Sequence, residues 1–421
     1  MSFKNTTSCN TLVLVGILAL AGFLRLYHLS AQPLWVDEHF TIANLAVPWN
    51  RIVQVSASLN NAPPLYYIGL KFLHGVFNLP YSALSLRLPS VIAGVLSVYF
   101  LYLFVQRLQR FAELNPKGLS PAHIAAFLLA INPLHIWYSQ DGRTFAIALL
   151  LLLACLVLHL EKQRIGLFVA IVALCAIHTQ GFLVYPLLFV IACCQSPTYR
   201  TFLKSCISPS APSFWIILSV PFSFMMLYFI MCQGGVLVHT VKRPFTGIEL
   251  FYTLYTFVCG TAFGPSILEL RTAIYAHDAR AVILRYLPTL VTGCLATGAI
   301  FLPILVDTVT SLRQRFRTHI IGYALLASGF MYALAIEFTQ PSPYHIRYTL
   351  SSLFGFIALW AFATSSAFHS RRKTILHGIL LASYVIIASI SLHNHYFNPR
   401  HAKYPPSREQ LHGIYDHALE E

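Results

Sequence analysis

Two adjacent carboxylates, Asp37 and Glu38, follow the first apolar run of a chain that has only 14 acidic residues among 421. One acid there is explained by the short amphipathic stretch that comes next, because acids stabilise the first turn of a helix. The second acid exceeds that need. A carboxylate can take the proton from a hydroxyl or amine while that group attacks. The pair is therefore a candidate for catalysis, with Asp37 favoured over Glu38.

A second candidate is the five-residue segment "SQDGR", residues 139–143, between two apolar runs. Five residues make a tight turn that holds an acid, Asp141, and a base, Arg143, at the membrane surface. A local Asp141–Arg143 pair, with Asp141 capping the next helix, is the simple structural alternative. The chemical interpretation is that both side chains face the same cavity as Asp37.

The third candidate is Arg347, which stands about one turn into a late apolar run, beside Tyr344 and His345. A charged group near hydrocarbon is unfavourable by a few kcal/mol unless it is paired or faces water. The planar guanidinium suits a phosphate, so we expect Arg347 to bind one at the outer leaflet. For any single arginine, a helix-end anchor is the alternative. The predicted phosphate-binding set is Arg143, Arg347, Lys71, Arg87, Tyr344 and His345.

The composition says what must position these residues. The chain is 57% hydrophobic and 10% charged with mean hydropathy +0.66, whereas soluble domains carry about 25% charged residues. Apolar runs of roughly 20 residues, long enough to cross a bilayer, recur throughout. We predict an all-α polytopic membrane protein. The expected spans are 11–29, 85–106, 119–138, 144–160, 165–179, 181–194, 213–231, 286–306, 319–337, 346–366 and 374–392.

Basic loops orient these spans. The net charge of +14 is explained by loops that stay in the cytoplasm, with no nucleic-acid partner. The basic loops are 107–118, 161–164, 195–212, 307–318 and 367–373. If the spans alternate, the candidate residues and the outer segments 30–61, 139–143 and 232–285 face the other side. The parity requires that 62–79 is a re-entrant or interfacial helix; 245–264 is also apolar but interrupted. Segment 393–421 is expected to be a short polar tail on the outer side.

Carboxylates and cations around one outward cavity suit a particular reaction. The carboxylate would activate an acceptor, and Arg or Lys would stabilise the charge on a departing phosphate. Both are needed to move a sugar from a lipid phosphate to an acceptor in one displacement. A polyprenyl-phosphate flippase, a lipid-linked glycan polymerase or ligase, and a non-catalytic scaffold are the alternatives. Charges at helix ends on one side favour surface chemistry over transport.

The order of these motifs resembles the GT-C glycosyltransferases, in the branch of protein O-mannosyltransferases and lipid A aminoarabinose transferases. The resemblance rests on "LWVDEHFT", "NAPPLYYIGLKFL", "LRLPSVIAGVLSVYFLYLFVQRL", "INPLHIWYSQDGRTFAIALLLLL", "IHTQGFLVYPLLF", "YHIRYTLSSLFGFIALWAF" and "SLHNHYFNPRHAKYPPSREQ". One departure is Asn61-Ala62, where the family favours His before Pro63-Pro64. An outer acceptor-binding domain of some relatives is not expected here.

The resemblance implies a GT-C bundle of about 11–13 transmembrane helices over 1–392. It implies transfer from a polyprenyl-phosphate sugar to a lipid, glycan or protein acceptor, with inversion, among membrane lipids. Asp37 would be the general base, and Glu38 and Asp141 match the acids near it and complete the predicted catalytic set. Arg143 and Arg347 match the family's cations. No cofactor is expected to be required, although the three acids offer oxygen ligands for a divalent cation. The expected location is a bacterial inner or plasma membrane, with the site on the periplasmic or extracellular face.

Overall fold

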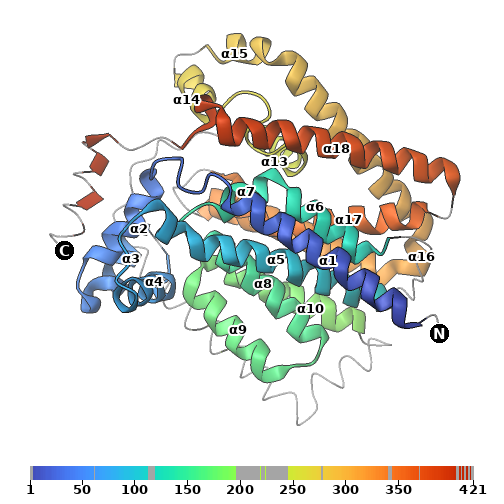
Figure 1. Ribbon diagram of the computed structural model, residues 1–421, viewed down its shortest axis with the longest axis horizontal. Coiled ribbons are helices and arrows are strands. Elements are labelled where there is room, and N and C mark those ends of the chain that lie inside the picture. The colour runs from blue at the N-terminus through green and yellow to red at the C-terminus, as the bar shows by residue number, and fades with distance from the viewer. Residues whose placement is uncertain are drawn as a thin grey trace.

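The computed structural model describes residues 3–60, 62–111, 119–195, 219, 223, 245–275, 278–339, 344–368, 370–403, 407–408, 410–411, 414–415 and 418. Throughout these residues the regular secondary structure is helical (Figure 1). This confirms the predicted all-α class. The expected span 213–231 lies outside the described residues, except for positions 219 and 223.

Four stretches of the described chain are long and apolar enough to cross a membrane. They fall on α5 (Ala83–Phe111), α16 (Leu287–Thr339), η3 with α17 (Ile346–Thr349 and Leu350–Ala367), and α18 (Arg371–Phe397). Shorter apolar helices accompany them: α1 (Phe3–Leu26, with its apolar part from Asn10), α6 (Pro121–Ile131), α8 (Phe145–Leu160), α9 (Arg164–Ile177), η2 with α10 (Thr179–Leu183 and Val184–Gln195), and α13 (Ile248–Cys259).

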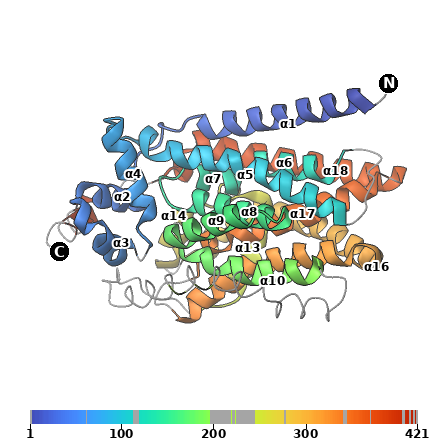
Figure 2. The same ribbon diagram turned by 90° about the horizontal axis from the view of Figure 1, so that it is seen from below.

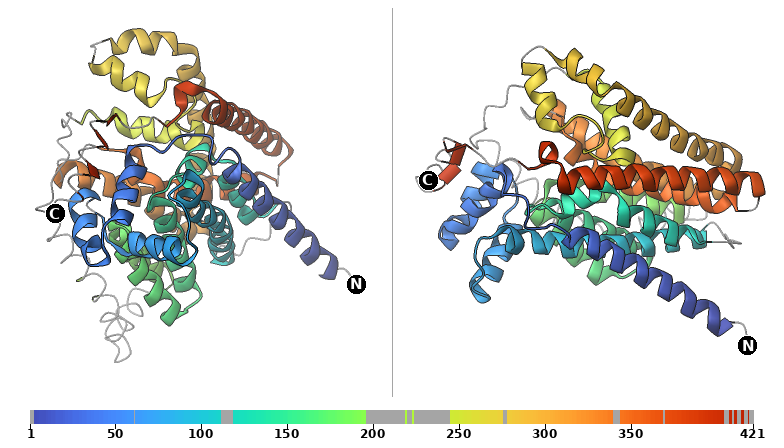
Figure 3. Two further views of the ribbon diagram at one scale, coloured as in Figure 1. Left: turned by 60° about the vertical axis from the view of Figure 1, so that its left-hand side comes forward. Right: turned by 45° about the horizontal axis from the view of Figure 1, so that its top comes forward.

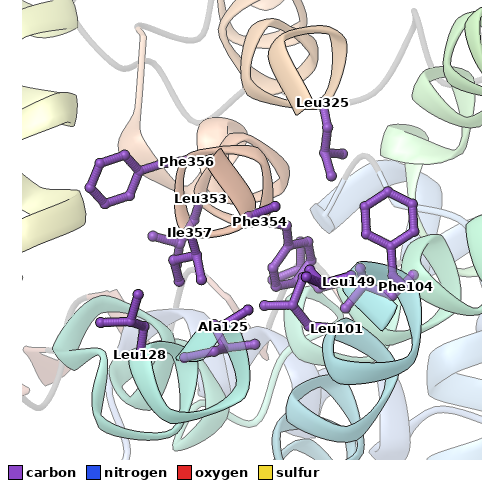
Figure 4. Close-up of a cluster of buried hydrophobic side chains, with 14 of the residues drawn as sticks. Leu101, Phe104, Ala125, Leu128, Leu149, Leu325, Leu353, Phe354, Phe356 and Ile357 are labelled. Atoms are coloured by element: carbon purple, nitrogen blue, oxygen red, sulfur yellow. The ribbon is translucent and has the colours of Figure 1, made fainter. Parts of the chain in front are cut away.

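Helix α17 forms the centre of the bundle. In its apolar window, 94% of the residues are buried inside the protein, against 22% for α16. Leu353, Phe354 and Ile357 of α17 meet side chains of α5, α6, α8 and α16 (Figure 4). At Gly355 a Cβ would lie 2.2 Å from the backbone nitrogen of Leu326 on α16. Only glycine allows these two helices to approach so closely.

Helix α16 is a hairpin of two legs. The side-chain oxygens of Thr308 and Tyr323 lie 2.8 Å apart, whereas residues 15 apart on a straight helix are separated by about 22 Å. The backbone leaves helical geometry at Arg315 (φ −124°, ψ 27°). The Arg315 guanidinium donates to Asp307 at 2.7 Å. The two legs correspond to the expected spans 286–306 and 319–337, and the basic segment 307–318 provides the reversal.

The expected span 119–138 is divided in two by Asn132. Helix α6 ends at Ile131 and α7 (Pro133–Ser139) begins directly after it. The Asn132 side chain accepts from the His135 backbone N–H at 2.9 Å and donates to the Phe257 carbonyl at 2.8 Å. Pro133 follows at the first helical position, where its missing N–H does no harm.

Short helices α2 (Val36–Ala46), α3 (Ile52–Asn60) and α4 (Leu65–Val76) pack together at the end of the bundle away from the N-terminus (Figure 2). Helix α4 is about 18 Å long, well short of the roughly 30 Å of hydrocarbon. This length agrees with the prediction that 62–79 does not cross. The remaining short elements are η1 (Trp49–Arg51), α14 (Ile267–Tyr275), α15 (Ala279–Arg285) and η4 (Pro399–His401).

The C-terminal segment lies at this same end, beside α2 and α3, while the N-terminus lies at the far end of α1 (Figure 3). Ile414 and Ala418 are buried in a second apolar cluster with residues of α2, α3 and α4. The Tyr415 hydroxyl lies 3.1 Å from Nδ1 of His39 on α2. The segment predicted as a polar tail therefore contributes to the packing of the end of the bundle that carries α2, α3 and α4.

Candidate active site

Asp37 and Glu38 occupy the first turn of α2, and the helix separates them. Successive residues on an α-helix differ in direction by about 100°, so the two carboxylates reach different partners. Trp35 is the residue before the helix, and its backbone N–H donates to Glu38 Oε2 at 3.3 Å, part of a capping box. This geometry explains why two acids are adjacent. Glu38 stabilises the start of the helix, and Asp37 is available for the site.

Glu38 is the scaffold acid. Its carboxylate accepts two hydrogen bonds from Arg87, both at 2.7 Å, and one from the Gly142 backbone N–H at 3.0 Å. The side chain is 0% exposed and that of Arg87 is 2% exposed. Burial would raise the pKa of Glu38, but Lys403, Arg87 and the Gly142 N–H lower it, and the pKa lies below its usual value. Both oxygens are engaged, so Glu38 fixes the turn at Gly142 against α2, and the prediction that Glu38 is catalytic conflicts with this geometry.

Arg87 uses all five of its N–H groups inside the protein. Besides the two bonds to Glu38, it donates to the carbonyl oxygens of Leu29, Gln32 and Pro33 at 2.7–3.0 Å. A guanidinium has five donors in total. The prediction that Arg87 binds a donor phosphate therefore conflicts with its geometry. It holds the segment between α1 and α2 in place.

Asp37 points to the other side, toward the late arginine. Arg347 donates to Asp37 Oδ2 at 2.9 Å, and the two side chains are 27% and 16% exposed. Arg143 donates to the main-chain carbonyl of Asp37 at 3.0 Å. Burial raises the pKa of Asp37, but Arg347, Arg143 and His345 outweigh it, so the pKa is lower than usual. Asp37 is a partly exposed carboxylate that is ionised at neutral pH.

Arg347 lies on the one-turn helix η3, whose start is capped by His345: Nδ1 of that ring accepts from the Arg347 backbone N–H at 3.2 Å. The guanidinium lies over the rings of Phe145 and Tyr348, 5.8 and 5.4 Å from their centroids. Its Nε is buried and has no hydrogen-bond partner within the described part of the chain. Two aromatic rings therefore lie beside the guanidinium, and one of its N–H donors is left without a partner in the described residues.

Asp141 lies in the turn between α7 and α8, behind α2. The Trp35 indole donates to Asp141 Oδ1 at 2.9 Å, and the Lys403 ammonium lies 3.3 Å from the same oxygen. Burial raises the pKa of Asp141, and the neighbouring Glu38 also raises it while Lys403 lowers it; the pKa stays above its usual value. The simple Asp141–Arg143 pair is not formed: Arg143 turns to Asp37, and Asp141 turns to Lys403.

The remaining predicted residues lie around this centre. The Lys71 ammonium donates to the Leu45 and Val47 carbonyls and lies over the Trp49 ring, so it closes the C-terminal end of α2. The Tyr344 hydroxyl lies 2.8 Å from Oγ1 of Thr253. Of the predicted set, Arg347 and Arg143 bind Asp37, and His345 binds the backbone of Arg347. Glu38 and Arg87 bind each other. Asp141 binds Trp35 and Lys403.

Two features were missed in the sequence. Lys403 lies in a polar segment 262 residues after Asp141, and no local spacing connects them. Tyr66 and Tyr67 of α4 are 4% and 0% exposed, and their hydroxyls have no hydrogen-bond partner among the residues described. Burial raises the pKa of both phenols, so they remain neutral donors. The "YY" pair could have been noted, because a buried tyrosine normally satisfies its hydroxyl.

No protein-family model matches the chain, and no curated protein matches it significantly in sequence. Solved structures of the Archaeoglobus fulgidus oligosaccharyltransferase share its fold. AglB with an inhibitory peptide and a dolichol-phosphate aligns with TM-score 0.54 and 13% identity over 97% of this chain and 57% of that one. The apo form gives 0.53 and 13% over 94% and 56%. The complex with Zn and sulfate gives 0.50 and 15% over 94% and 54%.

This chain spans little more than half the length of those oligosaccharyltransferases. At such identities the likeness defines the fold alone, which is the helical fold of those oligosaccharyltransferase structures. The expected all-helical membrane fold is confirmed, and membership of the GT-C superfamily stays a proposal. The O-mannosyltransferase and aminoarabinose transferase branch stays a proposal.

Proposed function

We propose that this protein is an integral-membrane glycosyltransferase that moves a sugar from a polyprenyl-phosphate donor to a lipid, glycan or protein acceptor on the non-cytoplasmic face. The contact between Asp37 and Arg347 supports this most directly. It joins a partly exposed carboxylate and a guanidinium from positions 310 residues apart at 2.9 Å, at one end of a GT-C bundle. A base and a phosphate-binding group side by side are what a single displacement requires.

The reaction follows from the two groups. The donor phosphate binds the Arg347 guanidinium, which releases Asp37 Oδ2 from its ion pair with Arg347. Asp37 accepts the proton of the acceptor hydroxyl or amine while that atom bonds to the anomeric carbon. The bond from this carbon to the phosphate oxygen breaks, and the electron pair leaves with the phosphate. Arg347 and Arg143 stabilise the charge that grows there. Attack from the face opposite the phosphate inverts the anomeric centre.

Other residues support this centre. Glu38 and Arg87 are positioning residues, because their polar atoms bind one another and the adjacent backbone. The Tyr66 and Tyr67 hydroxyls, buried without partners in the described residues, are assigned to hydroxyls of the sugar. Three other predicted residues bind elements around the centre: Lys71 binds the end of α2, Tyr344 binds α13, and His345 caps η3.

The substrate class rests on the fold and on the resemblance of the motifs. AglB, whose fold this chain shares, has been solved with a dolichol-phosphate and a peptide. We infer a polyprenyl-phosphate donor and place the protein in the O-mannosyltransferase and aminoarabinose transferase branch. A bacterial inner or plasma membrane is the proposed location, with the active site on the periplasmic or extracellular side.

Transfer can be tested with the purified full-length chain, a radiolabelled polyprenyl-phosphate sugar and membrane extract as the acceptor source. We expect label to move from the donor to an extractable lipid, glycan or protein. A panel of donors that carry mannose, glucose, arabinose or an aminosugar identifies the sugar. Failure of every donor to react with folded protein would refute the proposal. Movement of intact donor across a vesicle membrane would support the flippase alternative.

Arg347→Ala should weaken donor binding. A hydrogen bond to a charged group contributes about 1.5–3 kcal/mol, so we expect the donor Kd to rise by about 10- to 150-fold. Arg347→Lys keeps the charge but loses the planar fork, so its donor Kd should lie between those of the wild type and Arg347→Ala. The measurement is equilibrium binding of a radiolabelled polyprenyl phosphate to each variant. An unchanged Kd in Arg347→Ala would remove the phosphate role.

The pH dependence of transfer should report the ion pair. Because the pKa of Asp37 is below its usual value, the carboxylate stays ionised well under neutral pH, and the activity that needs it is lost only as the pH falls through that lowered pKa. In Arg347→Met the main lowering group is gone while burial still raises the pKa, so the acid limb of kcat/KM should move to higher pH. If the acid limb does not move, Asp37 is not the group whose protonation causes the loss of activity.

A further inference from the structure

The segment after α18 carries a buried lysine back into the site. Helix α18 ends at Phe397, and η4 (Pro399–His401) turns the chain. Lys403 follows with its side chain 2% exposed. Lysine is almost never fully buried unless it is paired. This side chain therefore has a specific partner at the acid cluster.

The contacts of Lys403 show which partner. Its ammonium donates to the Gln140 carbonyl at 2.9 Å and to Asp141 Oδ1 at 3.3 Å. It lies over the rings of Trp35 and Trp137, 5.5 and 5.7 Å from their centroids. A backbone carbonyl oxygen, a carboxylate oxygen and two aromatic rings surround one positive charge.

The backbone of Lys403 is also held. Its N–H donates to the Gln32 side-chain oxygen at 3.3 Å, and the Gln32 side-chain nitrogen donates to the His395 carbonyl at 2.8 Å. Asn398 caps η4 by accepting from the Arg400 N–H at 3.1 Å. The segment before α2 and the end of α18 thus fix the lysine from both sides.

These pairings leave each acid with its own protein cation. Asp37 has Arg347, Glu38 has Arg87 and Asp141 has Lys403. An oxygen-liganded divalent ion takes about six ligands, and Glu38 has neither oxygen to offer. Asp141 Oδ2 alone is a buried acid oxygen of this cluster without a partner in the described residues. Asp37 Oδ1 also has no hydrogen-bond partner in the described residues, since Arg347 binds Oδ2. Two oxygens, on acids that each already pair with a cation, fall short of about six ligands, so the residues do not fit a divalent cation as they stand.

We propose that Lys403 is a positioning residue that supplies, from the C-terminal segment, the positive charge that a divalent cation would otherwise provide at Asp141. The inference rests on the proposed function. Lys403 contacts both Asp141 and the ring of Trp35, which precedes α2 and itself donates to Asp141. Arg143, two residues further along the same turn, donates to the Asp37 carbonyl. The lysine therefore helps to hold the general base in place without touching substrate. Transfer by this protein proceeds without added metal.

The test uses Mn²⁺ as the probe and the purified full-length chain in detergent. Electron paramagnetic resonance counts bound Mn²⁺, and thermal unfolding with and without Mn²⁺ gives a second readout. We expect no Asp141-dependent Mn²⁺ binding in the wild type. Lys403→Met frees the Asp141 carboxylate and the Gln140 carbonyl oxygen. With water molecules as the remaining ligands, these oxygens should bind one Mn²⁺, and adding it should raise the Tm. The double variant Lys403→Met/Asp141→Asn should lose both. Lys373→Met, at the opposite end of α18, is the matched control and should behave as the wild type.

Transfer assays complete the test. EDTA should leave the wild type unchanged, whereas metal-free Lys403→Met should lose about tenfold or more in kcat/KM, with recovery on adding Mn²⁺. Asp141-dependent Mn²⁺ binding by the wild type would overturn the inference, as would a Lys403→Met variant that gains no Mn²⁺ site. If Lys403→Met does not fold, Lys403→Gln removes the charge and keeps a donor, and the same readouts apply. A wild type without transferase activity refutes the proposed function, while the Mn²⁺ binding still decides the role of Lys403.

Discussion

Asp37→Asn should abolish sugar transfer while the protein stays folded. The amide is almost the same size as the carboxylate but cannot take a proton from the acceptor. General base catalysis contributes about 10²–10⁴-fold to a rate, so kcat should fall by that factor. The ion pair with Arg347 is partly exposed, with 27% and 16% of the two side chains accessible, and its loss should change stability little. The assay is label transfer from the polyprenyl-phosphate donor.

A matched control isolates the base. Asp278→Asn changes an acid at the start of α15, outside the site, and should transfer at the wild-type rate. Donor binding by Asp37→Asn should be retained or tightened, because Arg347 then has no competing carboxylate. Transfer by Asp37→Asn at the wild-type rate would mean that another group removes the proton, and loss of donor binding would mean that Asp37 acts on the donor.

The sequence predicted which loops meet, but it did not predict which of their acids lie in the site and which hold the scaffold. Few acids, their clustering at helix ends and the basic loops on the opposite side were enough to place Asp37, Asp141, Arg143 and Arg347 together. The separation of Asp37 from Glu38 follows from helix geometry alone and could have been predicted. The role of Arg87 could not be predicted, because a lone arginine near the start of a helix is as often a membrane-interface anchor as the partner of an acid. Its true role depends on three carbonyl groups that only the folded chain brings together.

The helices show the same division. Apolar runs predicted most of the described spans, because crossing a membrane requires length and hydrophobicity. They did not predict the break at Asn132, where a side chain replaces helix hydrogen bonds with bonds to α13 and α18. Nor did they indicate that 398–403 returns to the site, because a polar segment carries no periodic pattern. Tertiary contacts fix both features, and single-sequence patterns do not record them.

Breaking the buried Glu38–Arg87 pair should have the largest effect on stability. Arg87→Met leaves the Glu38 carboxylate 0% exposed with only backbone donors, and leaves the carbonyls of Leu29, Gln32 and Pro33 without their donor. Removing one partner of a buried pair lowers the free energy of unfolding by about 3–5 kcal/mol. We expect a large fall in Tm in detergent, with loss of transfer as the turn at Gly142 loosens. The measurement is thermal unfolding followed by circular dichroism.

Two further variants show that the charge imbalance is the cause. Glu38→Gln/Arg87→Met removes both charges, and the glutamine oxygen can still accept from the backbone N–H groups of Trp35 and Gly142. Because replacing a buried pair by neutral groups is often nearly neutral, the double variant should recover most of the lost stability. Arg107→Met breaks a pair with Glu161 whose side chains are 22% and 31% exposed, and should change the free energy of unfolding by about 1 kcal/mol or less. A double variant as unstable as Arg87→Met would instead assign the effect to the three carbonyl groups that Arg87 binds, and Glu38 would lose its place as the scaffold acid.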